Sequence, residues 1–137
     1  MNFSGSILLV DDEPHIRKFI SLLLRHLGTT RIFEAPNGRE AIEVFKKQRP
    51  DLVMLDVNMP VMDGIETLRA LKELDPDCVV VMLTSLANRQ TIDEAAALGA
   101  NNYIRKDAPS EDIGRALAET IEACFEPQEP DGDPAPS

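Results

Sequence analysis

The chain has few basic residues, only two cysteines and no long apolar run, and each of these shortages argues against a class of protein. Its 14 lysines and arginines face 24 acidic residues, so the formal net charge is −10. That charge repels a phosphate backbone or an anionic membrane, and direct binding of nucleic acid or membrane is disfavoured. Two cysteines are too few for a disulfide framework, and we expect Cys78 and Cys124 to be reduced core thiols. The apolar runs are too short to span a bilayer and no basic signal segment opens the chain, so we expect a cytoplasmic protein.

The length and the hydrophobic content fit one domain with its own core. Hydrophobic residues make up 43% of the 137 residues and charged residues 28%, as in a globular protein with a well-solvated surface. The segment 126–137 differs, because it holds four of the ten prolines and four acidic residues but no basic residue. We therefore expect one folded domain over residues 1–125 and a disordered tail or linker stub over residues 126–137.

Short apolar runs alternate with longer amphipathic stretches. Three runs have the continuous apolar character of strands buried on both faces: Ile7–Val10, Leu52–Leu55 and Val79–Leu83. Weaker strand candidates are Arg31–Glu34 and Asn102–Ile104. A stretch with helical spacing follows each of the five runs, and this alternation predicts an α/β fold, with a parallel sheet, right-handed crossovers and helices on both faces.

The first of these helices shows an apolar face with a spacing of 3.6 residues. The members of that face are Ile16, Phe19, Ile20, Leu23 and Leu27. We expect this helix to begin at Pro14, behind an acidic residue that can cap it, and to stop at Gly28. The other helices are expected over residues 38–48, between Asp63-Gly64 and Asp75, over residues 89–98 and after Pro109.

Polar side chains follow the carboxyl ends of four expected strands, and nothing comparable follows the other ends. They are Asp11, Asp12 and Glu13 after the first strand, Asp56 and Asn58 after the third, Thr84 and Ser85 after the fourth, and Lys106, shortly after Tyr103, after the fifth. Ligands of open parallel sheets bind at this edge. Three carboxylates packed together repel one another, and a hard divalent cation with oxygen ligands removes that repulsion. The pattern therefore favours a Mg²⁺ site.

The same residues suit phosphoryl chemistry. The metal and Lys106 can neutralise phosphoryl oxygens, Thr84 can donate a hydrogen bond, and Asp56 can act as the nucleophile that forms an aspartyl phosphate. Taken singly, each feature has an ordinary structural explanation, such as helix capping for the acidic triplet, but their joint occurrence at one edge does not. Both histidines, His15 and His26, lie off the apolar face of the first helix, so we expect them at the surface and the phosphoryl donor on another protein.

Four segments, taken together, carry a specific pattern. They are Ile-Leu-Leu-Val-Asp-Asp-Glu-Pro at 7–14, Asp-Leu-Val-Met-Leu-Asp-Val-Asn-Met-Pro-Val-Met-Asp-Gly at 51–64, Val-Met-Leu-Thr-Ser at 81–85 and Gly-Ala-Asn-Asn-Tyr-Ile-Arg-Lys at 99–106. With the loop Ala-Pro-Asn-Gly-Arg-Glu-Ala at 35–41, they resemble the receiver domain of two-component response regulators, over Ser6 to about Phe125. The resemblance implies a flavodoxin-like, doubly wound sheet of five parallel strands in the order 2-1-3-4-5, with five helices.

The resemblance also implies a role for each polar residue. Asp56 would be the phosphoacceptor. With Asp56, the ligands of Mg²⁺ would be Asp12 directly, Asp11 mainly through water, and Asn58 through its backbone carbonyl. Lys106 would contact the phosphoryl group. Thr84 would move to donate a hydrogen bond to that group, and Tyr103 would turn inward into the space that Thr84 leaves.

The function implied is signalling. A sensor histidine kinase or a histidine phosphotransfer protein would supply the phosphoryl group, and an unknown downstream protein would bind the face of the fourth helix, fifth strand and fifth helix. A phosphorelay shuttle is a close variant, and a homodimer through the same face is a further candidate. The alternative is a phosphatase with an aspartyl-phosphate intermediate. Such enzymes usually have an Asp-x-Asp pattern and a cap, whereas Asp11 and Asp12 are adjacent and little chain is left for a cap.

The chain departs from the family pattern after Lys106. The family usually has a proline there, in a cis peptide, but Asp107 follows Lys106 and the first proline is Pro109. A cis bond before a residue other than proline costs roughly 3 kcal/mol. We therefore expect either a rearranged loop or a strained bond, and Lys106 is the site residue whose position is most in question.

A second departure predicts a slow loss of the phosphoryl group. Leu86 lies two residues after Thr84, where some rapidly dephosphorylating relatives carry an acid, and a leucine cannot orient an attacking water. We expect the phosphoryl lifetime to exceed that of the fastest members of the family. A half-life of seconds for the purified phosphoprotein would contradict this expectation.

Overall fold

The structure is a computed structural model that describes residues 5–29, 31–59, 61–85 and 89–125. These residues form strands and helices in strict alternation. The strands are β1 (Ser6–Val10), β2 (Arg31–Ala35), β3 (Leu52–Asp56), β4 (Val79–Thr84) and β5 (Asn102–Arg105). The helices are α1 (Pro14–His26), α2 (Gly38–Gln48), α3 (Gly64–Leu74), α4 (Arg89–Ala97) and α5 (Ser110–Phe125). Every predicted element is present, with ends within two residues of the expected ones.

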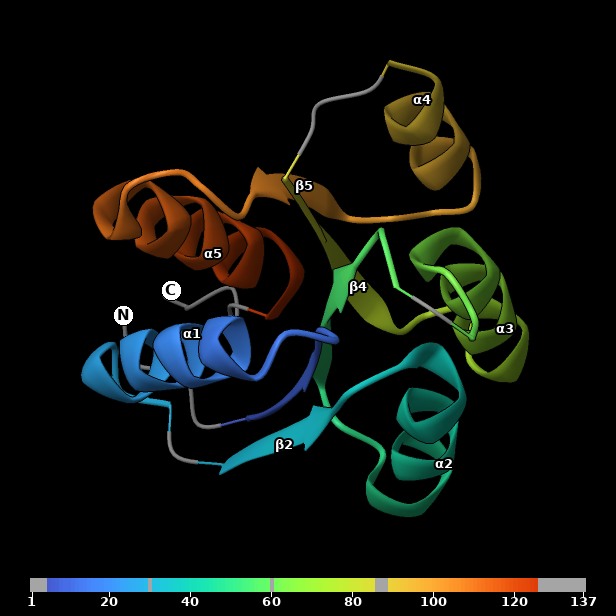
Figure 1. Cartoon of the computed structure of the whole chain (residues 1–137), viewed down its shortest axis with the longest axis horizontal. Coiled ribbons are helices and arrows are strands. Elements are labelled where there is room, and N and C mark those ends of the chain that lie inside the picture. Colours follow the sequence, from blue (N-terminus) through green and yellow to red (C-terminus); the bar gives the residue numbers. More distant parts are fainter. Residues whose placement is uncertain (1–4, 30, 60, 86–88, 126–137) are drawn as a thin grey trace, which may run out of the picture.

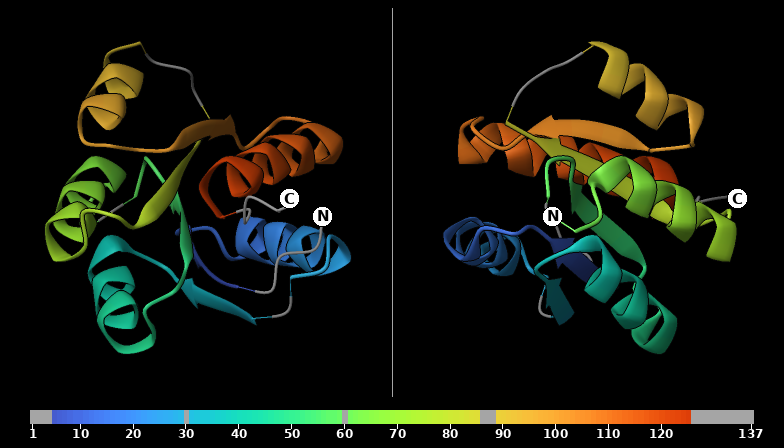
Figure 2. Two further views of the ribbon diagram at one scale, coloured as in Figure 1. Left: turned by 180° about the vertical axis from the view of Figure 1, so that it is seen from behind. Right: turned by 45° about the vertical axis from the view of Figure 1, so that its right-hand side comes forward.

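The five strands form one parallel sheet in the order β2-β1-β3-β4-β5, as expected. Helices α1 and α5 cover one face of the sheet, and α2, α3 and α4 cover the other (Figures 1 and 2). All residues of the inner strands β1, β3 and β4 are buried, whereas the edge strands β2 and β5 carry exposed positions. Two apolar cores result, one on each face, and this explains why only the inner strands read as continuous apolar runs.

Local signals fix the ends of the helices on the α2–α3 face. The Asn37 side chain accepts a hydrogen bond from the Glu40 N–H at the start of α2. Asp63 and Glu66 cap α3 reciprocally, each side chain accepting from the other residue's backbone N–H. Helix α2 ends at Gln48, and the C-cap residue Arg49 takes a left-handed φ of 46° just before Pro50. The boundaries of these two helices were therefore readable from the sequence.

Three details of the sequence-based prediction are wrong. Phe19 was placed on the buried face of α1, but its side chain is 43% exposed, and Leu24 is fully buried instead. Glu13 precedes α1 but makes no side-chain capping bond. Cys124 is exposed, so of the two thiols only Cys78 lies in the core. His15 and His26 are exposed, as expected. Leu86 and the segment 126–137 lie outside the described residues.

The start of α3 lies directly against the end of β3. The Gly64 N–H donates to the Val57 carbonyl at 2.8 Å. A Cβ at Gly64 would overlap the carbonyl oxygen of Asp56 and approach the Cα of Val57 to 2.7 Å. Neither obstacle is the flexible end of a side chain, so only glycine lets α3 pack this closely on the strand that carries Asp56.

We expect Gly64→Ala to lower the free energy of unfolding by about 1–3 kcal/mol, because the backbone of β3 or α3 must shift to admit the methyl group. Chemical denaturation of the purified chain measures this. Gly114→Ala in α5 is the matched control: its Cβ would meet only a Leu27 side-chain methyl at 3.3 Å, and alanine favours the helix. Equal losses for the two variants would contradict the prediction.

Candidate functional site

Two neighbouring strands bring the acidic residues together. Strands β1 and β3 are paired with Val10 opposite Leu55, so Asp11, just past β1, lies beside Asp56 at the end of β3. The sequence order of the strands reverses between β2-β1 and β1-β3, which makes this edge a topological switch point. One carboxylate oxygen each of Asp11, Asp12 and Asp56 lie within 4.8 Å of one another. The predicted acidic cluster is therefore present in the fold.

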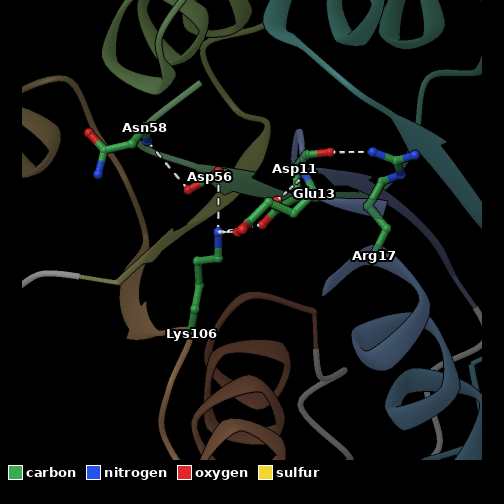
Figure 3. A network of polar contacts seen from close by, with 6 residues as sticks. All are labelled: Asp11, Glu13, Arg17, Asp56, Asn58 and Lys106. Atoms are coloured by element: carbon green, nitrogen blue, oxygen red, sulfur yellow. Dashed lines mark hydrogen bonds and ion pairs between the residues drawn. The ribbon is translucent and has the colours of Figure 1, made fainter. Parts of the chain in front are cut away.

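Lys106 comes to this cluster from the end of β5. Its Nζ is 2.8 Å from Oδ2 of Asp11, 3.3 Å from Oδ2 of Asp56 and 3.1 Å from Oε1 of Glu13 (Figure 3). The Lys106 side chain is only 8% exposed, and its backbone N–H donates to the Thr84 carbonyl at 2.7 Å. The ammonium therefore lies among three carboxylates. Although no proline follows Lys106, its side chain still reaches the acidic cluster.

The loop after Lys106 differs from a cis-proline loop. The Lys106–Asp107 peptide bond is trans. Arg105 donates from Nε and Nη2 to the two carboxylate oxygens of Asp107, at 3.0 and 2.9 Å. Its Nη2 also lies 3.4 Å from the Ser85 carbonyl oxygen, in the loop after β4. Of the two outcomes expected from the sequence, the loop is rearranged and no strained peptide bond is retained.

Burial dominates the electrostatics of Asp56. Loss of solvent and then the charge of Asp11 raise the pKa of Asp56 from 3.8 to about 7, although Lys106 and the Asn58 N–H oppose the shift. Burial also disfavours the Lys106 ammonium, but its pairing with Asp11 and the charge of Asp56 outweigh this and hold the pKa of Lys106 above its ordinary value. A lone lysine thus leaves the cluster short of positive charge.

The fit to a divalent cation can be tested on these atoms. Oδ2 of Asp11 and Oδ2 of Asp56 are buried, and no group in the described ranges donates a well-directed hydrogen bond to either. Each is instead close to the Lys106 charge at an ion-pair distance. Buried carboxylate oxygens that lack donors are expensive unless a cation meets them. A set of oxygen ligands of this kind suits Mg²⁺.

The other predicted site residues surround the cluster. Asn58 is exposed, and its backbone N–H is 3.4 Å from Oδ1 of Asp56, while its side chain points away from the cluster (Figure 3). Thr84 is buried at the end of β4. Tyr103 lies on β5 opposite Met82, two residues before Thr84, and its buried hydroxyl has no hydrogen-bond partner in the part of the chain that the structure describes. Ser85, which follows Thr84, is exposed.

Sequence reasoning missed one contact and one residue of this network. Glu13 was placed at this edge of the sheet, but its pairing with Lys106 was not foreseen. Arg17 was not singled out, yet its guanidinium donates to the Asp11 carbonyl. The sequence does hold a signal for Arg17, because it is the first arginine or lysine after the acidic triplet. It lies one helical turn beyond Glu13, whose carbonyl accepts a hydrogen bond from the Arg17 N–H.

Comparison with known proteins agrees with this geometry. The response regulator receiver domain family matches residues 7–118. The chain belongs to this family. The receiver is 33% identical over 115 residues to the chemotaxis protein CheY of Bacillus subtilis, covering 84% of this chain and 96% of the relative. It is 36% identical over 111 residues to sporulation initiation phosphotransferase F of the same species, covering 81% and 89%. Among solved structures, the CheX–CheY–BeF₃–Mg²⁺ complex of Borrelia burgdorferi aligns with a TM-score of 0.81 and 27% identity, covering 90% of each chain.

The family membership confirms the fold and the general function. The chain is a receiver domain of the two-component response regulators, and its sheet order and helix layout are those expected from the resemblance. Receivers are phosphoacceptor signalling domains, so the alternative of a phosphatase gains no support. None of the helices in the described ranges has the length and apolar character needed to cross a membrane.

The raised pKa of Asp56 predicts a pH-dependent stability of the metal-free receiver. Between about pH 4 and pH 7 the folded chain holds a proton on Asp56 that the unfolded chain has released, so its stability falls as the pH rises through this window. Asp56→Asn removes this penalty. Without Mg²⁺, we expect it to raise the free energy of unfolding by roughly 1–3 kcal/mol at pH 8 and by much less at pH 4.

Denaturation at the two pH values measures the effect, and carboxyl-carbon NMR follows the Asp56 titration directly. Lys106→Met should move that titration upward, because Lys106 lowers the pKa of Asp56. Asp77→Asn, at an exposed aspartate before β4, is the control and should show no such pH-dependent gain. A gain for Asp56→Asn that is equal at pH 4 and pH 8 would contradict the assignment.

Proposed function

We propose that Asp56 accepts a phosphoryl group from a phosphohistidine of a partner protein, in a reaction that requires Mg²⁺. The observation that carries the proposal is the placement of the buried Asp56 carboxylate beside both the Lys106 ammonium and the carboxylates of Asp11 and Asp12. A nucleophile, a fixed positive charge and a set of oxygen ligands thus converge at one edge of the sheet. This combination is what in-line transfer to a carboxylate needs.

The chemistry of the step is a displacement at phosphorus. An Asp56 carboxylate oxygen forms the new P–O bond, the P–N bond to the donor imidazole breaks, and the imidazole nitrogen takes up a proton. Asp56 must be ionised to attack, and at a pKa of about 7 a substantial fraction is ionised at neutral pH. Bound Mg²⁺ supplies positive charge for the phosphoryl oxygens and favours the ionised carboxylates. Asp11, Asp12, Asp56 and the Asn58 carbonyl would hold it.

Lys106 and Thr84 would complete the pocket around the phosphoryl group. The Lys106 ammonium already contacts Asp56, and would exchange part of its pairing with Asp11 and Glu13 for a phosphoryl oxygen. The Thr84 hydroxyl, at the end of the neighbouring strand, would donate a hydrogen bond to another. Both residues stabilise the charge that the transferred group brings into a buried site.

The output would come from the β5 side of the sheet. Movement of Thr84 toward the phosphoryl group would free space for Tyr103, whose buried hydroxyl lacks a partner among the described residues. Tyr103 lines a hollow of about 180 Å³ with residues of α4 and β5, so its movement would change the surface formed by α4, β5 and α5. The solved CheX–CheY complex supports a protein as the downstream partner, and similarity to a sporulation phosphotransferase keeps the relay variant in view.

We expect Asp56 to gain one phosphoryl mass when the chain is incubated with Mg²⁺ and acetyl phosphate, carbamoyl phosphate or phosphoramidate. Intact-mass analysis measures the gain. Asp56→Asn should gain none, because an amide is not a nucleophile under these conditions, and omission of Mg²⁺ should abolish the gain in the wild type. Asp77→Asn, which removes an exposed carboxylate, should be phosphorylated like the wild type.

Three outcomes would count against the proposal. Phosphorylation of Asp56→Asn to the wild-type extent would place the acceptor elsewhere. No added mass with any donor would mean that the trans loop after Lys106 has disabled the site or that this receiver signals without phosphorylation. Steady turnover of small phosphoesters by the wild type, beyond one phosphoryl group per chain, would favour the phosphatase.

A further inference from the structure

Arg17 connects three elements behind the acidic cluster. It lies in the first turns of α1, and its side chain is only 18% exposed. Its Nη1 donates to the backbone carbonyl oxygen of Asp11 at 2.6 Å (Figure 3). Its Nε donates to Oε1 of Glu34, on the edge strand β2, at 3.2 Å. One planar guanidinium thus ties the β1–α1 loop to β2 by two differently directed donors.

The contact with the Asp11 carbonyl bears on Asp12 more than on Asp11. Asp11 is held at three other points: its N–H donates to the Ala35 carbonyl at 3.2 Å, its Oδ1 accepts from the Glu13 N–H at 2.9 Å, and its Oδ2 pairs with Lys106 at 2.8 Å. The carbonyl of Asp11, however, belongs to the peptide group that leads into Asp12. Because that group is planar, the direction of the carbonyl sets the direction in which Asp12 leaves the loop.

Asp12 depends on this restraint because its own side chain has little else to hold it. Within the described ranges no group donates a hydrogen bond to the Asp12 carboxylate, and the residue is partly exposed. Its carboxylate nevertheless lies in the cluster with those of Asp11 and Asp56. The backbone must therefore aim the side chain. Two contacts fix the backbone here: the Glu13 N–H closes a turn across Asp12 onto Oδ1 of Asp11, and the Arg17 guanidinium holds the Asp11 carbonyl.

We propose that Arg17 is a positioning residue that aims the Asp12 carboxylate at the metal position. The inference rests on the proposed function, because it concerns the Mg²⁺ that Asp12 would bind. The role of Arg17 is directional. Its charge is already paired with Glu34, so the cluster gains little net charge from it. A lysine would keep the charge but has a single ammonium in place of a planar set of donors. In this geometry it could therefore donate to the Asp11 carbonyl or to Glu34, but not to both.

The test is the affinity of the unphosphorylated full chain for Mg²⁺ alone, measured by calorimetric titration and by amide NMR. Residues that orient metal ligands typically contribute 10–100-fold to metal affinity. We expect Arg17→Ala to weaken Mg²⁺ binding about 10-fold and Arg17→Lys about 3-fold. Glu34→Gln, which leaves the contact with the carbonyl intact, should weaken it about 2-fold or less.

Arg115→Ala is the matched control. Arg115 also pairs with one carboxylate, Asp112, at 3.2 Å, but it lies on the exposed side of α5 and contacts none of the site residues. Its variant should bind Mg²⁺ like the wild type. Phosphorylation by phosphoramidate gives a second readout: in Arg17→Ala the Mg²⁺ concentration for half-maximal rate should rise by the same factor as the dissociation constant, while the rate at saturating Mg²⁺ stays within about 3-fold.

The outcomes separate this inference from the proposed function. If the wild type binds Mg²⁺ and folded Arg17→Ala binds it equally well, the inference fails and the proposed function stands. If the maximal rate falls while the Mg²⁺ affinity is unchanged, Arg17 acts otherwise and the inference also fails. If the wild type binds no Mg²⁺, the proposed metal requirement fails and the inference with it. Should Arg17→Ala not fold, Arg17→Lys, which keeps the charge, is judged by the same criteria.

Discussion

The repulsion between carboxylates that lie close together at the carboxyl edge of the sheet is the main physical constraint on this receiver. Asp11 and Asp56 are almost fully buried and Asp12 lies beside them, and one ammonium, that of Lys106, faces the first two. Each buried charge costs several kcal/mol of solvation, which pairing offsets only when the geometry is good. The rest of the fold holds these groups together, since the carboxyl ends of β1 and β3, the neighbouring end of β4 and the loop after β5 all lie at this edge of the sheet.

The sheet topology brings these charged groups together from distant parts of the chain. Strands β1 and β3 are neighbours although α1, β2 and α2 separate them in sequence, and Lys106 arrives from the far edge by way of β5. The apolar inner strands and the two cores fix the position of each strand end, so the charged groups add chemistry to a scaffold that they do not have to stabilise. Helix α3 packs closely, at Gly64, against the strand end that carries Asp56. The two faces of the sheet thus supply stability, and its carboxyl edge carries the functional groups.

Much of this arrangement could be predicted from the sequence, because the relevant signals are local. Continuous apolar runs identify the inner strands, the capping pairs identify α2 and α3, and residues after parallel strands must share one edge. What could not be predicted depends on contacts between distant segments. The spacing in α1 marks an apolar face but not its rotation, so Phe19 proved exposed and Leu24 buried. Likewise the pairing of Glu13 with Lys106 joins residues 93 positions apart, and no periodicity reports it.

The Arg105–Asp107 pair has a consequence for how this receiver responds to its surroundings. The family pattern described in the sequence analysis has a proline after the lysine, whereas this chain has an ion pair there, between side chains that are about half exposed. Ions weaken such a pair, since the screening length falls to about 8 Å at physiological ionic strength and to about 3 Å at 1 M. The restraint that Arg105 and Asp107 add to this loop therefore weakens as the salt content of the medium rises, whereas the Lys106 N–H still donates to the Thr84 carbonyl.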